Sequence, residues 1–408
     1  MSTIKIGGFD HIKKVEIGGG QPVVIQTMWK DKLLLQDKSG EEDVLRRIEG
    51  LAKMGCEILR FALPKIEDAD TLGKLCTICS MPLVADIHFD YKIALRILDF
   101  PIAKIRINPG NIGKIEKVKT VLQKAKDKNV PIRIGVNAGS LPIDIRNNVK
   151  KGKIKTAEAL VEAAKREIAI FDQHNFTDYI VSMKASSVPE TILCNTQFDL
   201  FRRSTNIAVP LHIGVTEAGP LIAGVVRNTA ALYNLLCKGI GDTVRVSLSD
   251  TMEHEVIAAR EILLAVNDYF TAENNERGGA PPSLQTASAA RASALEGGGR
   301  SFSATPPALR AGYARIVSCP RCGRCSFDTH LWSGKWQNYL YGIKADITVA
   351  FMGCPVNGPG EAENADIGIT GAGSKVLIFK HGKIKHRINA DQAETVFKKE
   401  LDELVCRT

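Results

Sequence analysis

Three cysteines recur at three-residue spacing in the segment "IVSCPRCGRCSFD": Cys319, Cys322 and Cys325. A fourth, Cys354, follows a β-rich run and begins the Gly/Pro-rich segment "CPVNGPGEA". Thiols in such an arrangement can bind zinc, bind an iron–sulfur cluster or form disulfides. The chemistry of this region therefore depends on which other ligands the chain offers.

A disulfide is the weakest of the three alternatives. The N-terminal segment lacks the long apolar core of a secretory signal, so we expect a cytoplasmic protein whose thiols stay reduced. Clustered cysteines then indicate metal binding, and scattered ones indicate packing. We interpret the remaining cysteines as packing residues: Cys56, Cys76, Cys79, Cys194, Cys237 and Cys406.

Zinc and iron–sulfur chemistry differ in the ligands they need. A structural zinc site needs four ligands, but no second C-x-x-C pair lies near Cys354. His330 is the nearest histidine that could complete a zinc site. A 4Fe–4S cluster held by three thiolates leaves one iron for another ligand, and Glu361 is the nearest candidate. An iron with a displaceable oxygen ligand can act as a Lewis acid as well as pass electrons. Considered by itself, Glu361 would by default be an exposed loop carboxylate.

Eight short apolar runs, each followed by a helical pattern, occupy residues 20 to about 250. Eight consecutive βα units favour a (β/α)8 barrel over a doubly wound sheet, because no Gly-rich dinucleotide fingerprint follows the first run. The predicted strands are "PVVIQTM", "EILRFAL", "PLVADIHFD", "AKIRINPGN", "PIRIGVNAG", "YIVSMKASS", "LHIGVTEAG" and "DTVRVSLSD".

Polar residues occur near the ends of these predicted strands. Residues two apart in a strand share a face, and the active sites of barrel enzymes lie at the carboxyl ends of the strands. We expect the following side chains to converge there: the pairs Asp86 and His88, Arg106 and Asn108, and Arg245 and Ser247, together with Arg60, Arg133, Asn137, Lys184 and Glu217.

Five cations face two carboxylates in this set. Internal ion pairs are one explanation, with Arg60 or Arg106 paired to Asp86 and Arg245 paired to Glu217. That explanation leaves about three positive charges unmatched, which is costly in a barrel interior. Arginine binds phosphate well through its planar fork of donors, so the pattern favours a phosphorylated substrate in the barrel mouth.

Composition divides the chain into three parts. We predict a barrel domain over residues 1–270, an Ala/Ser/Gly/Pro-rich flexible linker over 271–312, and a small C-terminal α/β domain over 313–408 that carries the cysteine motif. No apolar run reaches the roughly 18 residues needed to span a bilayer. The formal charge is +9, but the basic tract at Lys150, Lys151, Lys153 and Lys155 lacks interleaved aromatics, so nucleic acid is the weaker interpretation.

The chain resembles a known enzyme family over nearly its whole length apart from the linker. The segments "PLVADIHFDYKIAL", "RINPGNIG", "PIRIGVNAGSL", "KAS", "HIGVTEAG", "GIGDTVRVSL", "SCPRCGR" and "GCPVNGPGEA" are similar, in this order, to motifs of the 4-hydroxy-3-methylbut-2-enyl diphosphate synthase (IspG/GcpE) family. The family acts in the methylerythritol phosphate route to isoprenoids. The resemblance implies two-electron reductive ring opening and dehydroxylation of 2-C-methyl-D-erythritol 2,4-cyclodiphosphate, with ferredoxin or flavodoxin as electron donor.

The resemblance also implies roles for particular residues. The metal ligands would be Cys319, Cys322, Cys354 and Glu361, with Cys325 a bystander at a position where the family usually has a polar residue. The groups that contact the carbon skeleton or manage protons would be Asp86, His88, Asn137 and Glu217. The residues that hold the diphosphate would be Arg60, Arg106, Asn108, Arg133, Lys184, Arg245 and Ser247.

Family members work as homodimers in which the cluster domain of one chain caps the barrel of the other. The low-complexity linker departs from the family, so capping within one chain stays open as an alternative. Two other functions also stay open at this point: a different barrel enzyme acting on a phosphorylated substrate with a zinc-binding tail, and an RNA-binding protein.

Overall fold

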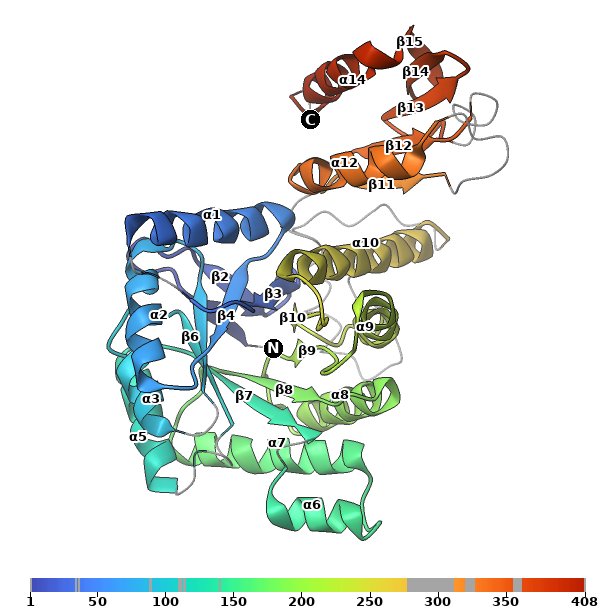
Figure 1. Ribbon diagram of the computed structural model, residues 1–408. Coiled ribbons are helices and arrows are strands. Elements are labelled where there is room, and N and C mark those ends of the chain that lie inside the picture. The colour runs from blue at the N-terminus through green and yellow to red at the C-terminus, as the bar shows by residue number, and fades with distance from the viewer. Residues whose placement is uncertain are drawn as a thin grey trace. The chain divides into compact units, whose positions relative to one another are not determined.

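The structure is a computed structural model, and it describes residues 2–33, 35, 37–87, 90–108, 112, 115–138, 141–276, 312–319, 327–354 and 362–406. The chain divides into two compact units, Met1–Leu309 and Arg310–Thr408, which are described separately below (Figure 1). The expected linker falls mostly outside the described residues. The last helix of the first unit extends to Glu276 and so includes the first six residues of the expected linker.

The first unit is a (β/α)8 barrel, as predicted. Its eight strands form one parallel sheet in the order β8-β7-β6-β5-β4-β3-β10-β9, and a bridge between Val181 and Leu211 joins β8 to β9, which closes the ring. Each strand coincides with one of the eight predicted runs. The strands are β3 (Val24–Met28), β4 (Ile58–Ala62), β5 (Leu83–Ile87), β6 (Lys104–Ile107), β7 (Ile132–Asn137), β8 (Tyr179–Lys184), β9 (His212–Ile213) and β10 (Thr243–Val244).

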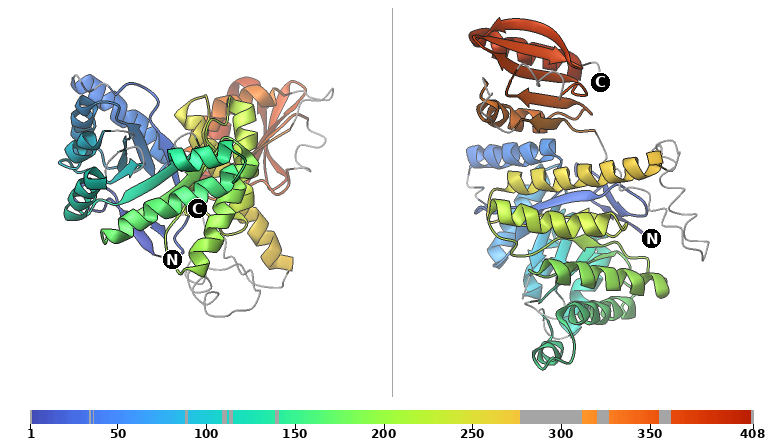
Figure 2. Two further views of the ribbon diagram at one scale, coloured as in Figure 1. Left: turned by 90° about the horizontal axis from the view of Figure 1, so that it is seen from below. Right: turned by 90° about the vertical axis from the view of Figure 1, so that its right-hand side faces the viewer.

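Helices surround the strands (Figures 1 and 2). Local sequence determines where they begin and end: the Asp37 side chain accepts from Gly40 N at 2.8 Å at the start of the first helix, which ends at Gly55 with φ of +113°. The helices are α1 (Lys38–Met54), α2 (Ile66–Ile78), α3 (Tyr91–Ile97), α5 (Ile115–Asp127), α6 (Ile143–Lys150), α7 (Thr156–Gln173), α8 (Val188–Ser204), α9 (Leu221–Leu236) and α10 (Met252–Glu276).

The alternation of side chains along each strand separates two environments. Outward residues such as Leu59, Ile105 and Ile132 are fully buried and belong to the large apolar core that includes the helices. Inward residues are largely polar, among them Arg60, Arg106 and Arg133 in the same three strands. The apolar layer between strands and helices therefore stabilises the barrel, and charged side chains can occupy its interior.

An N-terminal hairpin, which the sequence patterns did not predict, packs against inward residues near the starts of the strands. It consists of β1 (Thr3–Ile6) and β2 (Val15–Gly18), paired antiparallel. Its isoleucines and valine form an apolar cluster with Val24, Ile58, Val84 and Ile180. These four residues lie in the amino-terminal halves of their strands, so the hairpin covers the end of the barrel opposite the expected active site.

The second unit is a five-stranded mixed sheet with two helices. The strand order is β11-β12-β13-β14-β15, with β11, β12 and β13 parallel and the last two pairings antiparallel. Residues of both helices, including Trp336 and Phe397, pack with one face of the sheet. The sequence patterns missed β13. The elements are β11 (Arg315–Ser318), α12 (Thr329–Tyr341), β12 (Thr348–Met352), β13 (Ile367–Ala372), β14 (Lys375–Lys380), β15 (Lys383–Asn389) and α14 (Ala390–Val405).

In the described part of the chain, no helix combines the length and the apolar character that crossing a membrane requires. The four lysines of the basic tract, Lys150, Lys151, Lys153 and Lys155, are exposed.

Candidate functional site

The strands bring most of the predicted polar residues into one buried cluster. Arg60, Asp86, Arg106, Asn108, Arg133 and Lys184 are all at most 8% exposed, although each carries a charge or an amide. Because their strand neighbours face the helices, these side chains face the barrel interior. Asn137 ends β7 and is half-buried, and Arg245 and Ser247 follow β10 and are half-buried too. His88 lies outside the described residues.

Asp86 is shared by two arginines. Its Oδ1 accepts from Arg106 Nη1 at 3.0 Å, and its Oδ2 lies 3.4 Å from Arg60 Nε. Arg106 also donates from Nη2 to the Gly135 carbonyl at 3.1 Å, and, with the Asn137 amide oriented so that its oxygen accepts, to Asn137 at 3.3 Å. The predicted ion pair is confirmed for both arginines at once, so one carboxylate offsets two cations.

Arg245 has a different partner from the one the sequence suggested. Its Nη2 lies 3.1 Å from Glu255 Oε1, so the pairing of Arg245 with Glu217 was wrong. Glu255 is on α10 and only 1% exposed; it also lies 2.9 Å from Lys30 Nζ and accepts from Thr27 Oγ1 at 2.6 Å. Glu255 therefore neutralises charge at this side of the barrel, a role that its position in the middle of a helical pattern did not indicate.

Glu217 lies in the loop after β9 and is exposed. Its φ is +53°, a region that costs a non-glycine residue backbone strain. The neighbouring Ala218 carbonyl accepts from Arg227 Nη1 at 2.8 Å, which fixes the loop from its other side. The described contacts join the Glu217 side chain to none of the buried cations.

Arg133 and Lys184 are buried cations without a carboxylate. Among the described residues Arg133 makes no ion pair, and its Nε and Nη1 are buried without a hydrogen-bond acceptor. Burial, together with Arg60 and Arg106 nearby, lowers the pKa of Arg133 well below its usual value. Burial and the surrounding arginines likewise lower the pKa of Lys184, and burial lowers that of Arg60 to about 10.

Two further polar residues lie in the interior, and the sequence analysis missed both. Lys104 is fully buried, with Nζ 3.4 Å from Gln26 Oε1, and burial lowers its pKa well below the usual value. His212 is also fully buried, and its Nε2 lies 3.0 Å from Lys184 Nζ. Lys104 lies two residues before Arg106, and His212 lies two residues before Gly214. Because residues two apart in a strand share a face, this spacing could have predicted that both face the barrel interior.

Two glycines provide the space that these long side chains occupy. A Cβ at Gly135 would overlap the guanidinium of Arg106. A Cβ at Gly214 would overlap the Arg245 carbonyl oxygen and come within 2.8 Å of Lys184 Nζ. The glycines in "IRIGVN" and "HIGVTE" thus allow charged groups to fill the barrel where aliphatic side chains usually pack.

Two of the predicted metal ligands follow neighbouring strands of the second unit. Cys319 follows β11 and Cys354 follows β12; these strands are parallel neighbours, and Cys319 N donates to the Phe351 carbonyl at 2.9 Å. Cys319 packs on an apolar cluster that contains Met352 and Ala362, the residue after Glu361. Both cysteines and Ala362 therefore lie at the same end of the sheet. Cys322, Cys325 and Glu361 themselves lie outside the described residues.

Most of the other cysteines pack as predicted. Cys56, Cys76, Cys79 and Cys194 are buried in the barrel core, and burial raises the pKa of Cys56 and Cys194 to about 12 and that of Cys79 to about 11. Cys237 is partly buried against the same core. The interpretation was wrong for Cys406, which is exposed at the end of α14. All eight described cysteines are free thiols.

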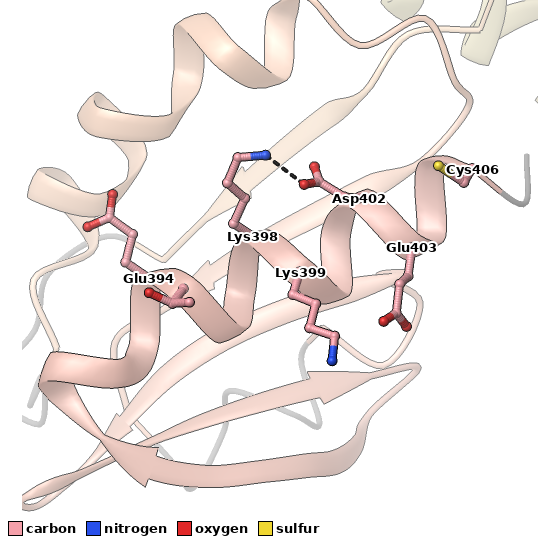
Figure 3. A pocket seen from close by; sticks show the side chains of 7 residues that line it. Glu394, Lys398, Lys399, Asp402, Glu403 and Cys406 are labelled. Carbon is pink, nitrogen blue, oxygen red and sulfur yellow. Dashed lines mark hydrogen bonds and ion pairs between the residues drawn. The ribbon is translucent and has the colours of Figure 1, made fainter.

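A hollow on the surface of α14 offers no comparable chemistry. Glu394, Lys398, Asp402, Glu403 and Cys406 line it together with Thr395 and Lys399 (Figure 3). Three of its charged groups have ion-pair partners, since Lys398 Nζ lies 2.6 Å from Asp402 Oδ2 and Glu394 pairs with Lys335. The candidate site is therefore the barrel interior, with the cysteines of the second unit as a separate candidate metal centre.

Comparisons with known proteins match both units. The family description "GcpE TIM-barrel domain" matches residues 10–260, and "GcpE protein C-terminal domain" matches residues 315–403. The chain is 44% identical over 404 residues to the 4-hydroxy-3-methylbut-2-en-1-yl diphosphate synthase (flavodoxin) of Treponema denticola, covering 95% of this chain and 92% of that one.

Two further relatives carry the same name. The protein of Treponema pallidum is 44% identical over 418 residues, with 98% of this chain and 91% of the relative covered. The protein of Bacillus subtilis is 40% identical over 387 residues, with 95% and 88% covered. The similarity thus spans both units of the chain.

Proposed function

The chain belongs to the GcpE family of 4-hydroxy-3-methylbut-2-en-1-yl diphosphate synthases, oxidoreductases of isoprenoid biosynthesis, and we propose that its barrel interior binds 2-C-methyl-D-erythritol 2,4-cyclodiphosphate. The observation that carries this proposal is the buried, unpaired guanidinium of Arg133. A guanidinium that is 1% exposed and lacks acceptors for Nε and Nη1 needs an anion.

The charge balance of the interior supports a polyanion. Asp86 is occupied by Arg60 and Arg106, and Glu255 is occupied by Arg245 and Lys30. Arg133, Lys184 and Lys104 are left without a carboxylate among the described ion pairs. A diphosphate supplies negative charge and several acceptor oxygens at once, so it can offset three cations in one binding event.

Within this site the residues divide into two groups. The carbon skeleton and its protons are assigned to Asp86, His88, Asn137 and Glu217. The exposed position of Glu217 in a strained loop suits a group that approaches substrate from the barrel mouth. The diphosphate is assigned to Arg60, Arg106, Asn108, Arg133, Lys184, Arg245 and Ser247.

The second unit is proposed to hold one 4Fe–4S cluster through Cys319, Cys322, Cys354 and Glu361. The fit rests on thiols that follow two adjacent parallel strands and on an apolar surface beside them that includes Met352 and Ala362. When bound, the cluster would deliver electrons one at a time and offer an iron that can accept a substrate oxygen. The reaction that it would support takes up two electrons and two protons, opens the cyclic diphosphate and releases the hydroxyl as one water.

Flavodoxin is the proposed electron donor, and the edge of the second unit's sheet offers it a docking surface. Residues 367–390 contain five lysines and arginines and no Asp or Glu. Lys383, Lys385 and Arg387 on β15 are exposed and make no ion pair with a described residue. Arg387 pairs with Leu377, Leu377 with Thr370, and Thr370 with Met352, two residues before Cys354. The basic strand is thus in register with the cysteine end of β12, about 15 Å away at three strand spacings.

A second copy of the chain is the proposed oligomeric partner. Ile222 is 80% and Val226 is 62% exposed, one turn apart on α9. On α8, Leu193 and Leu200 are 49% and 64% exposed. Large apolar side chains gathered on two neighbouring helices favour association. Sedimentation of the wild type and of Ile222→Glu tests this: a dimer that the substitution dissociates supports the proposal, whereas a wild-type monomer contradicts it.

Anaerobic reconstitution tests the function as a whole. The full chain is purified without oxygen, its iron and sulfide are counted, and the cyclodiphosphate is added with a low-potential reductant. We expect about four irons and four sulfides per chain and conversion to (E)-4-hydroxy-3-methylbut-2-enyl diphosphate. A protein that binds zinc instead of iron, or a loaded cluster that leaves the cyclodiphosphate unchanged, would contradict the proposal.

A further inference from the structure

We propose that Lys184 and His212 form a proton-linked pair beneath the diphosphate site, so that the enzyme takes up a proton from solvent when it binds its anionic substrate. The inference rests on the proposed function, because it assumes that the barrel interior binds the cyclodiphosphate. It adds His212 and Thr243 as positioning residues for Lys184.

The geometry allows the pair to share only one proton. Lys184 Nζ lies 3.0 Å from His212 Nε2, and His212 Nδ1 lies 3.3 Å from Thr243 Oγ1. If the ammonium donates to Nε2, the imidazole is neutral and its Nδ1–H faces the threonine hydroxyl. If the imidazole donates instead, the amine is neutral. A doubly protonated pair would set two donors against each other, so the hydrogen bond excludes it.

The charged groups that act on the pair are positive, and two of them, Arg133 and Lys104, make no ion pair with a described residue. The cations that act on His212 are Arg133, Lys104 and Arg60. Those that act on Lys184 are Arg133, Arg245, Arg60 and Arg106. The two carboxylates of the region, Asp86 on β5 and Glu255 on α10, are held by arginines. Burial and these cations lower the pKa values of both Lys184 and His212 well below their usual values.

The local backbone holds the amine in place for this role. His212 and Thr243 are fully buried and paired across β9 and β10, so neither side chain can leave the contact without disturbing the sheet. The absence of a side chain at Gly214 leaves room for the Lys184 amine, because a Cβ there would come within 2.8 Å of Nζ. The amine is thus supported from below by His212 and confined at its side by the β9 backbone.

An anion reverses the electrostatic balance and so changes the protonation of the pair. Without substrate, the surrounding cations favour the pair with fewer protons. A diphosphate beside Lys184 favours the ammonium and raises the pKa of the pair. Between the free and bound pKa values, binding consumes a proton from solvent. Affinity then falls as pH rises through this window, by up to about tenfold per pH unit for one proton.

Calorimetric titration measures the proton directly. The full chain is titrated with the cyclodiphosphate in the absence of reductant, in buffers of different ionisation enthalpy between pH 6.5 and 8.5. The cyclic diphosphate has no group of its own that titrates in this range, so the buffer dependence reports protons taken up by the protein. We expect net uptake in the wild type and tighter binding at the lower pH.

Two substitutions assign the proton, and a third serves as control. Lys184→Arg keeps the positive charge but cannot be deprotonated, and His212→Gln keeps a hydrogen-bonding group that does not titrate. Both variants should bind with reduced proton uptake and a flatter pH dependence. His11→Gln removes an exposed histidine of the N-terminal hairpin and should behave as wild type.

The outcomes separate this inference from the proposed function. If the wild type does not bind the cyclodiphosphate, the proposed function fails. If it binds without proton uptake at any pH in the range, or if uptake is unchanged in both Lys184→Arg and His212→Gln, the proton-linked pair is wrong while the anion site stands.

Discussion

Gly135 lies directly against the guanidinium of Arg106. Arg106 Nη2 donates to the Gly135 carbonyl at 3.1 Å, and the same guanidinium holds Asp86 at 3.0 Å. A Cβ at position 135 would overlap its atoms. The position of the arginine in the candidate site therefore depends on a missing side chain one strand away.

Replacing Gly135 with alanine should displace Arg106 and weaken substrate binding. We expect kcat/KM for the cyclodiphosphate to fall by about 10- to 100-fold, since a charge-assisted contact is worth about 1.5–3 kcal/mol. Gly50→Ala is a matched control, because nothing lies within 4 Å of a Cβ there and the residue is inside α1. Steady-state kinetics on both variants check the prediction, and equal kcat/KM values would show that Arg106 does not depend on this glycine.

Arg133 should reduce the stability of the ligand-free protein. Arg133→Met removes a buried, unpaired charge and keeps most of the volume, so the free energy of unfolding should rise by about 1–3 kcal/mol. Denaturant unfolding monitored by circular dichroism measures this. Arg166→Met is the control, because Arg166 is on the surface and pairs with Asp144 and Glu162; its loss should cost less than about 1 kcal/mol. Destabilisation by Arg133→Met would mean that Arg133 has partners in the ligand-free state.

Lys104 should make stability depend on pH in the alkaline range. Its folded pKa is depressed below the unfolded value of about 10.5, so between these two values the unfolded chain binds more protons. The free energy of unfolding contributed by this residue therefore rises with pH through that window and falls as pH is lowered. Lys104→Met should be more stable than wild type at pH 7, and the difference should shrink towards pH 10. A difference that does not vary with pH would contradict the buried, depressed amine.

Replacement of Cys319 or Cys354 should remove the cluster, whereas replacement of Cys325 should not. Cys319→Ser and Cys354→Ser should lose iron and visible absorbance, because each removes a thiolate ligand. Cys325→Ser should retain both and keep activity, since Cys325 is predicted to be a bystander. Iron and sulfide counts after anaerobic purification provide the measurement. Loss of the cluster in Cys325→Ser would show that the assignment of Glu361 as fourth ligand is mistaken.

The basic strand β15 should matter only for the protein electron donor. Combined Lys383→Glu, Lys385→Glu and Arg387→Glu should lower kcat/KM for flavodoxin by tenfold or more and weaken its salt dependence. Activity with a small chemical reductant should be unchanged, because the substitutions leave the barrel and the cysteines intact. Unchanged flavodoxin kinetics would instead mean that these cations act only to prevent strand pairing between molecules.

The barrel could be predicted from sequence because each strand is a short apolar run followed by a helical pattern. The predicted polar residues could be found for the same reason, since polar groups such as Asp86 and Arg106 interrupt runs that otherwise pack. What escaped prediction depends on contacts distant in sequence. In the sequence, Glu255 looks like any glutamate in a helix, and only the packing of α10 beside β3 and β10 places it next to the barrel cations. His212 and Lys104 stand at the starts of strands, and only the closed barrel shows that their side chains are buried.

The N-terminal hairpin and β13 escaped for a different reason. The hairpin strands β1 and β2 are only four residues long, and β13 contains two glycines, so neither segment gives a clear strand pattern without its pairing partners. The conformation of Glu217 was also beyond sequence reasoning, because a positive φ at a non-glycine residue is imposed by the surrounding loop.

The affinity of Arg133→Met for the cyclodiphosphate tests whether the unpaired buried cations bind the substrate's diphosphate. Equilibrium titration without reductant compares this variant with wild type and Arg166→Met. We expect Arg133→Met to bind at least about 30-fold more weakly, corresponding to a lost charged contact of about 2 kcal/mol, although the variant is the more stable protein. Wild-type affinity in Arg133→Met would show that Arg133 does not bind the diphosphate.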